Sequence, residues 1–83
     1  MIVGMTLQRR TPEELLGDAI RARRAGLGWS QEDFALACGL HRTYISQLER
    51  GKKSPTLRTL CMLARALKVS IVDLVRSTTT TDK

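Results

Sequence analysis

The sequence contains few of the residues from which metal centres, disulfide frameworks and catalytic sites are built. It has one histidine, two cysteines, two prolines and three aromatic side chains, and it contains no CxxC motif and no glycine-rich phosphate loop. No serine has the partners of a catalytic triad, and no motif indicates a cleft with paired carboxylates. No stretch approaches the ~20 apolar residues that a membrane-spanning helix needs. We therefore expect no enzyme, no metal or cofactor, no small-molecule ligand and no membrane association.

The length of the chain indicates how many domains it can form, and its net charge indicates the kind of partner that it binds. The 83 residues suffice for one domain with a small core. Because aromatic residues are scarce, that core is expected to consist mainly of Leu, Ile, Val and Ala side chains from packed helices. The net charge of +6 and the isoelectric point near 10.2 favour a polyanionic partner. Cys38 and Cys61 fall on expected inward helix faces, so we interpret them as reduced core residues of a cytoplasmic protein.

Capping residues and glycines divide the chain into five expected helices. Thr11 and Glu14 form a capping box at the first helix, and Thr56 and Ser70 are placed to cap the last two. The expected helices cover about 12–25, 31–38 and 42–50, then one after Thr56 and one after Ser70. No segment alternates like a β-strand, so we expect an all-α fold. The expected divisions are a flexible N-terminus (1–10), a helical domain (11–76) and a polar tail (77–83).

Residues 31–51 form the pattern around which the rest of the chain is organised. Ser30 can cap a short helix, which Gly39 ends because glycine adopts the left-handed conformation without steric cost. A second helix begins about three residues later, with Ile45 and Leu48 on its inward face. Its outward face is polar and consists of Arg42, Thr43, Tyr44, Ser46, Gln47 and Arg50. Two short helices joined by a tight turn indicate a helix-turn-helix, in which the second helix is the candidate recognition helix.

Several residues coincide with a known family at fixed spacing. They are Gln31, Ala35, Gly39, Ile45, Glu49, Gly51 and Pro55, with Leu60, Ala64 and Leu67 in the following helix. Through them, residues 13–76 resemble the helix-turn-helix family of the phage lambda repressor and Cro proteins. The segment LHRTYISQLERG is also similar to the controller proteins of restriction–modification systems, which are single-domain members of similar length. The resemblance implies a five-helix, lambda-repressor-like DNA-binding domain.

The resemblance also implies which side chains contact double-stranded DNA at its major groove. The base-reading positions match Arg42, Thr43 and Gln47. Arginine can donate twice to guanine and glutamine can pair with adenine, so the chemistry agrees with this role. The expected phosphate-binding residues are Gln31, Tyr44, Ser46, Arg50, Lys52 and Lys53. Two of these have alternatives, because Tyr44 can pack against the neighbouring loop and Ser46 can face solvent.

Arg24 and Glu49 match family positions that form a largely buried ion pair. The match implies a structural role, in which the pair orients the recognition helix against the first helix. Arg23 is the rival partner for Glu49, one residue away. His41 stands at the capping position of the recognition helix, where the family often has Ser or Asp, so we expect a weak cap there.

The expected function is sequence-specific regulation of transcription by a homodimer that binds a two-fold-related DNA operator. A single domain reads few bases, so two half-sites about one helical turn apart are expected. The expected dimer surface consists of Met62, Ile71, Val72 and Val75. Two alternatives stay open: the antitoxin half of a toxin–antitoxin pair, and a protein–protein adaptor that keeps the fold. An adaptor would not need the basic residues of the recognition helix and the loop after it.

Overall fold

The computed structural model describes residues 10–79, and all regular secondary structure in this range is helical. Its helices are α2 (Pro12–Gly26), α3 (Gln31–Cys38), α4 (Arg42–Glu49), α5 (Leu57–Leu67) and α6 (Ile71–Arg76). The expected all-α fold of five helices is confirmed. None of these helices is long and apolar enough to cross a bilayer.

The two ends of the chain are described only in part. The predicted flexible N-terminus (1–10) lies outside the described residues except for Arg10, which forms ion pairs with α2. The predicted polar tail (77–83) is described over 77–79, where it continues from α6 as a turn. The predictions for 1–9 and 80–83 lie outside the described residues.

Side-chain caps begin four of the five helices at the residues that the sequence indicates. The Glu14 N–H donates to the Thr11 hydroxyl and the Thr11 N–H donates to the Glu14 carboxylate, both at 3.0 Å. The side chains of Ser30, Thr56 and Ser70 each accept the N–H of the residue three positions later. In α4, by contrast, His41 makes no capping hydrogen bond. The position of α4 therefore depends on the helices packed against it more than on its own cap.

Four helices end in a residue with left-handed backbone conformation. Gly28, Gly39, Gly51 and Lys68 have φ values of 80°, 74°, 74° and 62°. At Gly51 the amide donates to the Leu48 carbonyl, and the next amide, of Lys52, donates to the Gln47 carbonyl at 2.8 Å. This pair of hydrogen bonds is the Schellman motif, which satisfies carbonyls that a helix end leaves free. It turns the chain sharply at the end of α4 and places the basic loop directly after that helix.

The core is built mainly from aliphatic side chains, as expected, with Phe34 as its one fully buried aromatic. Ile20, Ile45, Leu48, Leu63 and Leu74 are buried with it. Cys38 also lies in the core, and burial raises the pKa of its thiol to about 11. The prediction for Cys61 was wrong. This thiol is exposed, because it lies on the side of α5 opposite the buried Leu63, Ala64 and Leu67.

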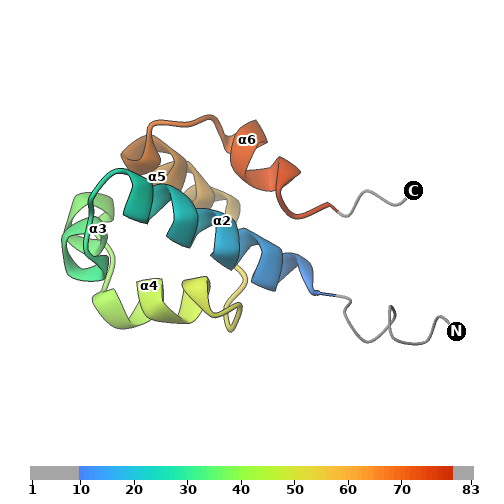
Figure 1. Ribbon diagram of the computed structural model, residues 1–83, viewed down its shortest axis with the longest axis horizontal. Helices are drawn as coiled ribbons and strands as arrows, with labels where there is room; N and C mark the ends of the chain where they lie inside the picture. Colours follow the sequence, from blue (N-terminus) through green and yellow to red (C-terminus); the bar gives the residue numbers. More distant parts are fainter. Residues whose placement is uncertain (1–9, 80–83) are drawn as a thin grey trace, which may run out of the picture.

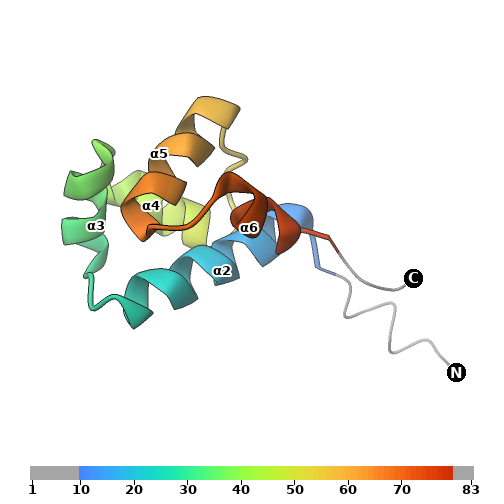
Figure 2. The ribbon, with the colours of Figure 1, turned by 90° about the horizontal axis from the view of Figure 1, so that it is seen from above.

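Helix α2 forms the centre of the arrangement (Figures 1 and 2). It packs against α4 on one side and against α5 and α6 on the other. At one end of the molecule, α3 packs against both α4 and α5. In Figure 1, α4 lies below α2 and α6 lies above it. The outward face of α4 and the C-terminal helix therefore occupy different sides of the molecule.

Helices α2 and α4 approach each other closely at Gly17. A Cβ atom at this position would lie 2.4 Å from the Leu48 carbonyl oxygen and 2.6 Å from the Glu49 carbonyl oxygen. Gly51 makes a similar approach, because its Cβ would lie 2.9 Å from the Glu14 Cα. The two glycines thus allow the C-terminal end of α4 to contact the backbone of α2 directly.

Candidate nucleic-acid interface

Helix α4 is held by one face and presents the other to solvent. Ile45 and Leu48 are fully buried, whereas Arg42 and Thr43 are exposed at the start of the helix. Gln47 is half-buried, one turn after Thr43. The three predicted base-reading residues therefore lie on a helix whose opposite side is packed into the core. Arg42 has no acidic partner within residues 10–79.

The two residues with alternative interpretations differ in their surroundings. Tyr44 is partly buried and packs against the hydrophobic core. Ser46 is half-buried and lines a groove between α2 and α4. Its backbone carbonyl accepts a hydrogen bond from Arg50 Nε at 3.4 Å. Arg50 is thus folded back along α4 while its terminal nitrogens stay available.

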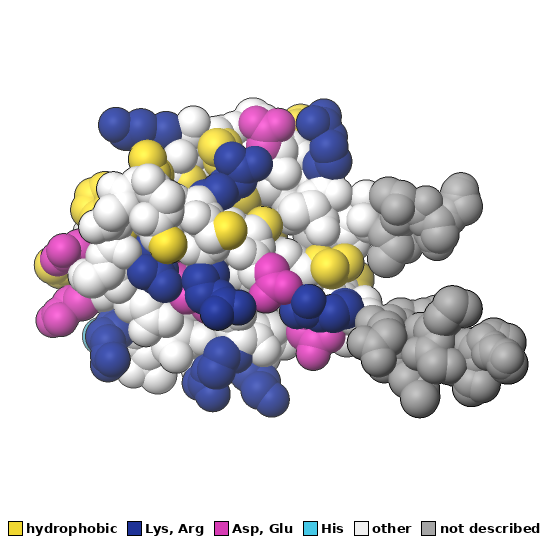
Figure 3. All heavy atoms as spheres, in the orientation of Figure 1, with side chains coloured by type: hydrophobic (Ala, Val, Ile, Leu, Met, Phe, Trp, Pro, Cys, Tyr) yellow, Lys and Arg dark blue, Asp and Glu magenta, His cyan; other side chains and the backbone are white. Residues whose placement is uncertain are grey.

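Three basic side chains follow the recognition helix. Arg50, Lys52 and Lys53 are all exposed, and within the described part of the chain none of them pairs with an acid. The Schellman turn at Gly51 keeps them close to the C-terminal end of α4. Figure 3 shows Lys and Arg side chains over the middle and lower part of one face as well as along its upper edge, with Asp and Glu between some of them. Such a surface suits a polyanion.

Arg24, and not Arg23, pairs with Glu49. Arg24 donates from Nε to Glu49 Oε2 at 2.5 Å and from Nη2 to Oε1 at 3.0 Å, while its Nη1 donates to the Trp29 carbonyl at 2.8 Å. The Glu49 side chain is only 3% exposed, and Arg23 is exposed to solvent. The hydrogen bonds with Glu49 raise the pKa of Arg24 against the opposing effect of burial, so the guanidinium stays charged.

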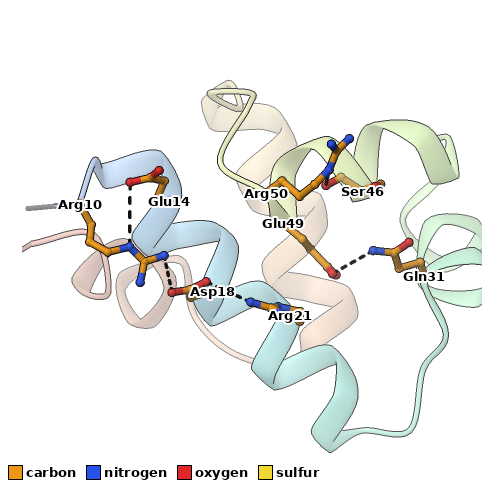
Figure 4. Close-up of a pocket in the computed structure, with 8 residues that line it drawn as sticks. All are labelled: Arg10, Glu14, Asp18, Arg21, Gln31, Ser46, Glu49 and Arg50. Carbon is orange, nitrogen blue, oxygen red and sulfur yellow. Dashed lines mark hydrogen bonds and ion pairs between the residues drawn. The ribbon is translucent and has the colours of Figure 1, made fainter. Parts of the chain in front are cut away.

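Gln31 is drawn into the same network. Its Nε2 donates to Glu49 Oε1 at 3.0 Å, as Figure 4 shows. The sequence predicts a phosphate contact for Gln31 and contains no signal for this hydrogen bond. A side-chain amide has two N–H donors, so one stays free beside the N-terminus of α3. Glu49 therefore connects α2, α3 and α4 through one carboxylate.

A groove of about 370 Å³ lies between α2 and α4. Its lining residues are Arg10, Glu14, Asp18, Arg21, Gln31, Ser46, Glu49 and Arg50. On the α2 side, Arg10 Nη2 lies 2.7 Å from Asp18 Oδ2 and Arg21 Nη2 lies 3.3 Å from Asp18 Oδ1. Sequence reasoning missed this row. The spacing of three residues between Asp18 and Arg21 on one helix is a signal that could have indicated part of it.

The predicted dimer residues separate into two places. Ile71, Val72 and Val75 lie together on α6 and line an apolar hollow of about 420 Å³. Val72 is 60% exposed and Val75 is 40% exposed, although both are apolar. Met62 lines a different groove, on the outer side of α5, with Leu57 and Cys61. Among the residues that the structure describes, no three His, Cys, Asp or Glu side chains are grouped to hold a metal ion.

Comparisons with known proteins agree with this geometry. Residues 20–74 match the family model described as helix-turn-helix. The control protein C.SmaI of Serratia marcescens is 43% identical over 63 residues, which cover 76% of this chain and 75% of that protein. The structure of the clp gene regulator ClgR from Corynebacterium glutamicum has a TM-score of 0.78 and 32% identity, over 83% of this chain and 73% of that one. The restriction–modification controller C.Esp1396I, solved as a tetramer with its natural 35-base-pair operator, has a TM-score of 0.72 and 28% identity, over 84% and 97%.

Proposed function

The chain belongs to the helix-turn-helix family, and on that basis we propose that it regulates transcription by binding a two-fold-related DNA operator as a homodimer. The observation that carries the proposal is the state of α4. Within residues 10–79 its outward side chains have no acidic partners, while its inward side is fixed by core packing and by the Arg24–Glu49 pair. A rigid helix with free donors is what reading base edges in the major groove requires.

Each proposed contact has a chemical basis. Arg42 donates to guanine, Gln47 pairs with adenine, and Thr43 contacts a thymine methyl or a backbone oxygen. The free N–H of Gln31 and the positive end of α3 face one phosphate strand, and Arg50 lines the same groove as Gln31. Lys52 and Lys53 face the other strand. Ser46 and Tyr44 are secondary candidates for backbone contact, because both side chains are partly buried.

The proposed dimer surface is the apolar face of α6. Ile71, Val72 and Val75 leave an apolar hollow that the described part of the chain does not cover. A second copy of α6 would bury it, and a two-fold axis there would pair two recognition helices with two half-sites. Met62 lies in the other groove, so we assign it a weaker role in this interface.

Within the class, we propose a restriction–modification controller as the specific role. Its support is the likeness to C.SmaI and to C.Esp1396I, which was solved on its own operator. A cytoplasmic location follows from this role, because the DNA target lies there. The antitoxin and adaptor alternatives have no comparable support. An adaptor in particular gives no reason for Arg42, Lys52 and Lys53 to be exposed together beside the recognition helix.

Replacing Arg42 by alanine tests the proposal. The operator is first selected by the wild-type protein from a library of random duplexes. Because Arg42 is exposed, Arg42→Ala should fold normally and lose about 1–3 kcal/mol of binding free energy per half-site on that operator. The loss on random DNA should be smaller, and preference at one base pair in each half-site should relax.

The Lys52→Ala, Lys53→Ala double variant is the matched control. The wild-type dimer should show a slope of log affinity against log salt of roughly −5 to −7, if each protomer neutralises three or four phosphates. The control should flatten this slope and weaken all DNAs alike. If the wild-type protein selects no sequence, the proposed function is wrong. If Arg42→Ala weakens operator and random DNA equally, Arg42 is a phosphate contact and base reading falls to Thr43 and Gln47.

A further inference from the structure

The groove between α2 and α4 contains two arginines that the proposed DNA contacts do not use. Arg10 and Arg21 both project from the α2 side, and both are held by Asp18 (Figure 4). Their side chains are 48% and 60% exposed. Exposed ion pairs of this kind add little to folding stability. Stability therefore does not account for two guanidinium groups on a single carboxylate.

The two arginines are held unequally. Arg10 lies 2.7 Å from Asp18, within strong charge-assisted hydrogen-bond distance, whereas Arg21 lies 3.3 Å away and is the more exposed of the two. Asp18 consequently keeps a close partner when Arg21 moves. A guanidinium has five N–H donors, and Arg21 uses one of them here. Arg21 is thus free to bind an anion without stranding the carboxylate.

The opposite side of the groove is already assigned to the DNA backbone. Gln31, Ser46 and Arg50 line it, and all three are proposed phosphate contacts. Arginines balance the acids of the groove: Glu49 pairs with Arg24, Asp18 pairs with Arg10 and Arg21, and Glu14 lies 3.9 Å from Arg10. Arg50 has no acidic partner in the described residues. A space of about 370 Å³ holds roughly twelve waters, which is ample for a phosphate group and its remaining hydration.

We propose that the α2–α4 groove seats a phosphate of the operator backbone and that Arg21 is its contact from α2. Arg10 is a positioning residue, because it keeps Asp18 paired while Arg21 turns to the phosphate. The inference rests on the proposed DNA-binding function and extends the phosphate contacts from α3 and α4 to α2. The bound phosphate would lie on the strand that passes the N-terminus of α3, on the other side of the recognition helix from Lys52 and Lys53.

The first test compares Arg21→Ala with Arg23→Ala. Both variants remove one exposed positive charge from the same helix, but Arg23 does not line the groove. Arg21→Ala should reduce the magnitude of the salt slope by about 0.9 for each groove, or about 1.8 for a dimer, and should weaken operator and random DNA by the same factor. Arg23→Ala should leave the slope close to that of the wild-type protein. If the two variants have equal slopes while the wild-type protein still selects its operator, the groove proposal is wrong and the proposed function stands.

The second test locates the phosphate. Operators that carry one neutral methylphosphonate linkage at each successive position are titrated with wild-type protein and with Arg21→Ala. At one position per half-site the linkage should weaken Arg21→Ala less than it weakens the wild-type protein, because one of the partners of that phosphate is already missing. Independent effects at every position would contradict the proposal. A second result would also contradict the proposal: DNA-free protein binds inorganic phosphate through Arg21, but no methylphosphonate position depends on Arg21. The groove would then be a site for a small anion.

Discussion

At the scale of single residues, Glu49 determines how the recognition helix is oriented. Its carboxylate accepts from Arg24 on α2 and from Gln31 on α3, and it is almost fully buried at the last residue of α4. The residue expected to contact phosphate and the helix expected to read bases therefore share one carboxylate. A movement of the Gln31 side chain would therefore affect the end of α4 through the single hydrogen bond between Gln31 and Glu49.

Glu49→Ala should lower the free energy of unfolding by about 3 kcal/mol or more, because it leaves the Arg24 guanidinium without its partner. DNA affinity should fall only as a consequence of the lost stability. Urea denaturation followed by circular dichroism measures the effect. The matched variant Arg24→Met with Glu49→Leu removes both charges and should recover most of the stability. If the double variant is no more stable than Glu49→Ala, packing of the site matters more than the stranded charge.

At the scale of helices, the contact between α2 and α4 depends on the missing side chain of Gly17. Glycine inside a helix is usually unfavourable, by up to about 1 kcal/mol relative to alanine. Here the atoms that a Cβ would meet are backbone carbonyls of α4, which cannot rotate away. The steric requirement of the helix crossing therefore outweighs the intrinsic helix propensity.

Gly17→Ala should destabilise the protein by about 1–3 kcal/mol, in spite of the better helix propensity of alanine, because α4 must shift away from α2. Operator affinity should fall further than stability alone explains, since the shift moves the recognition helix. Gly26→Ala is the control on the same helix. Its Cβ would meet no atom within 4 Å, so it should be neutral or slightly stabilising. Equal effects of the two substitutions, in thermal melts and DNA titrations, would contradict the role assigned to the crossing.

At the scale of the whole molecule, the recognition helix and the uncovered apolar hollow lie apart. The hollow belongs to α6, which lies on the other side of α2 from α4 (Figure 1). This separation lets one copy contact DNA and another copy of the chain at the same time. Specificity then depends on both surfaces, because a single half-site distinguishes few sequences.

Val72→Asp should produce a folded monomer with greatly weakened operator binding, because a charge would be buried in the apolar dimer interface without a partner. Val75→Asp should act in the same way. Sedimentation equilibrium at micromolar concentration gives the oligomeric state. Leu57→Asp is the control: Leu57 is 68% exposed and lies in the groove with Met62, so this variant should stay dimeric. If Leu57→Asp dissociates and Val72→Asp does not, the interface lies on α5. If Val72→Asp unfolds, Val72 belongs to the core.

Local pattern was enough to predict the helices, their limits within about one residue and the helix-turn-helix between Ser30 and Gly51. Side-chain caps and left-handed glycines act within a few residues of their own position, so the sequence contains them completely. The inward position of Ile45 and Leu48 also followed from spacing alone, because a helix has 3.6 residues per turn.

Tertiary structure decided the features that depend on which helices meet. Adjacent residues on a helix point about 100° apart, so only the packing of α2 on α4 selects Arg24 over Arg23 as the partner of Glu49. The same packing brings Gln31 to Glu49, 18 positions later in the sequence. It also brings Gly17 to the carbonyl of Leu48, 31 positions later. The separation of Met62 from Val72 follows from the side of α5 that the core covers. The exposure of Cys61 could have been predicted from spacing, because Cys61 lies opposite Leu63 on the same helix. The contacts of Arg24, Gln31 and Gly17 join segments that are distant in the chain, and the local sequence does not specify on which side of a helix its partner helix packs.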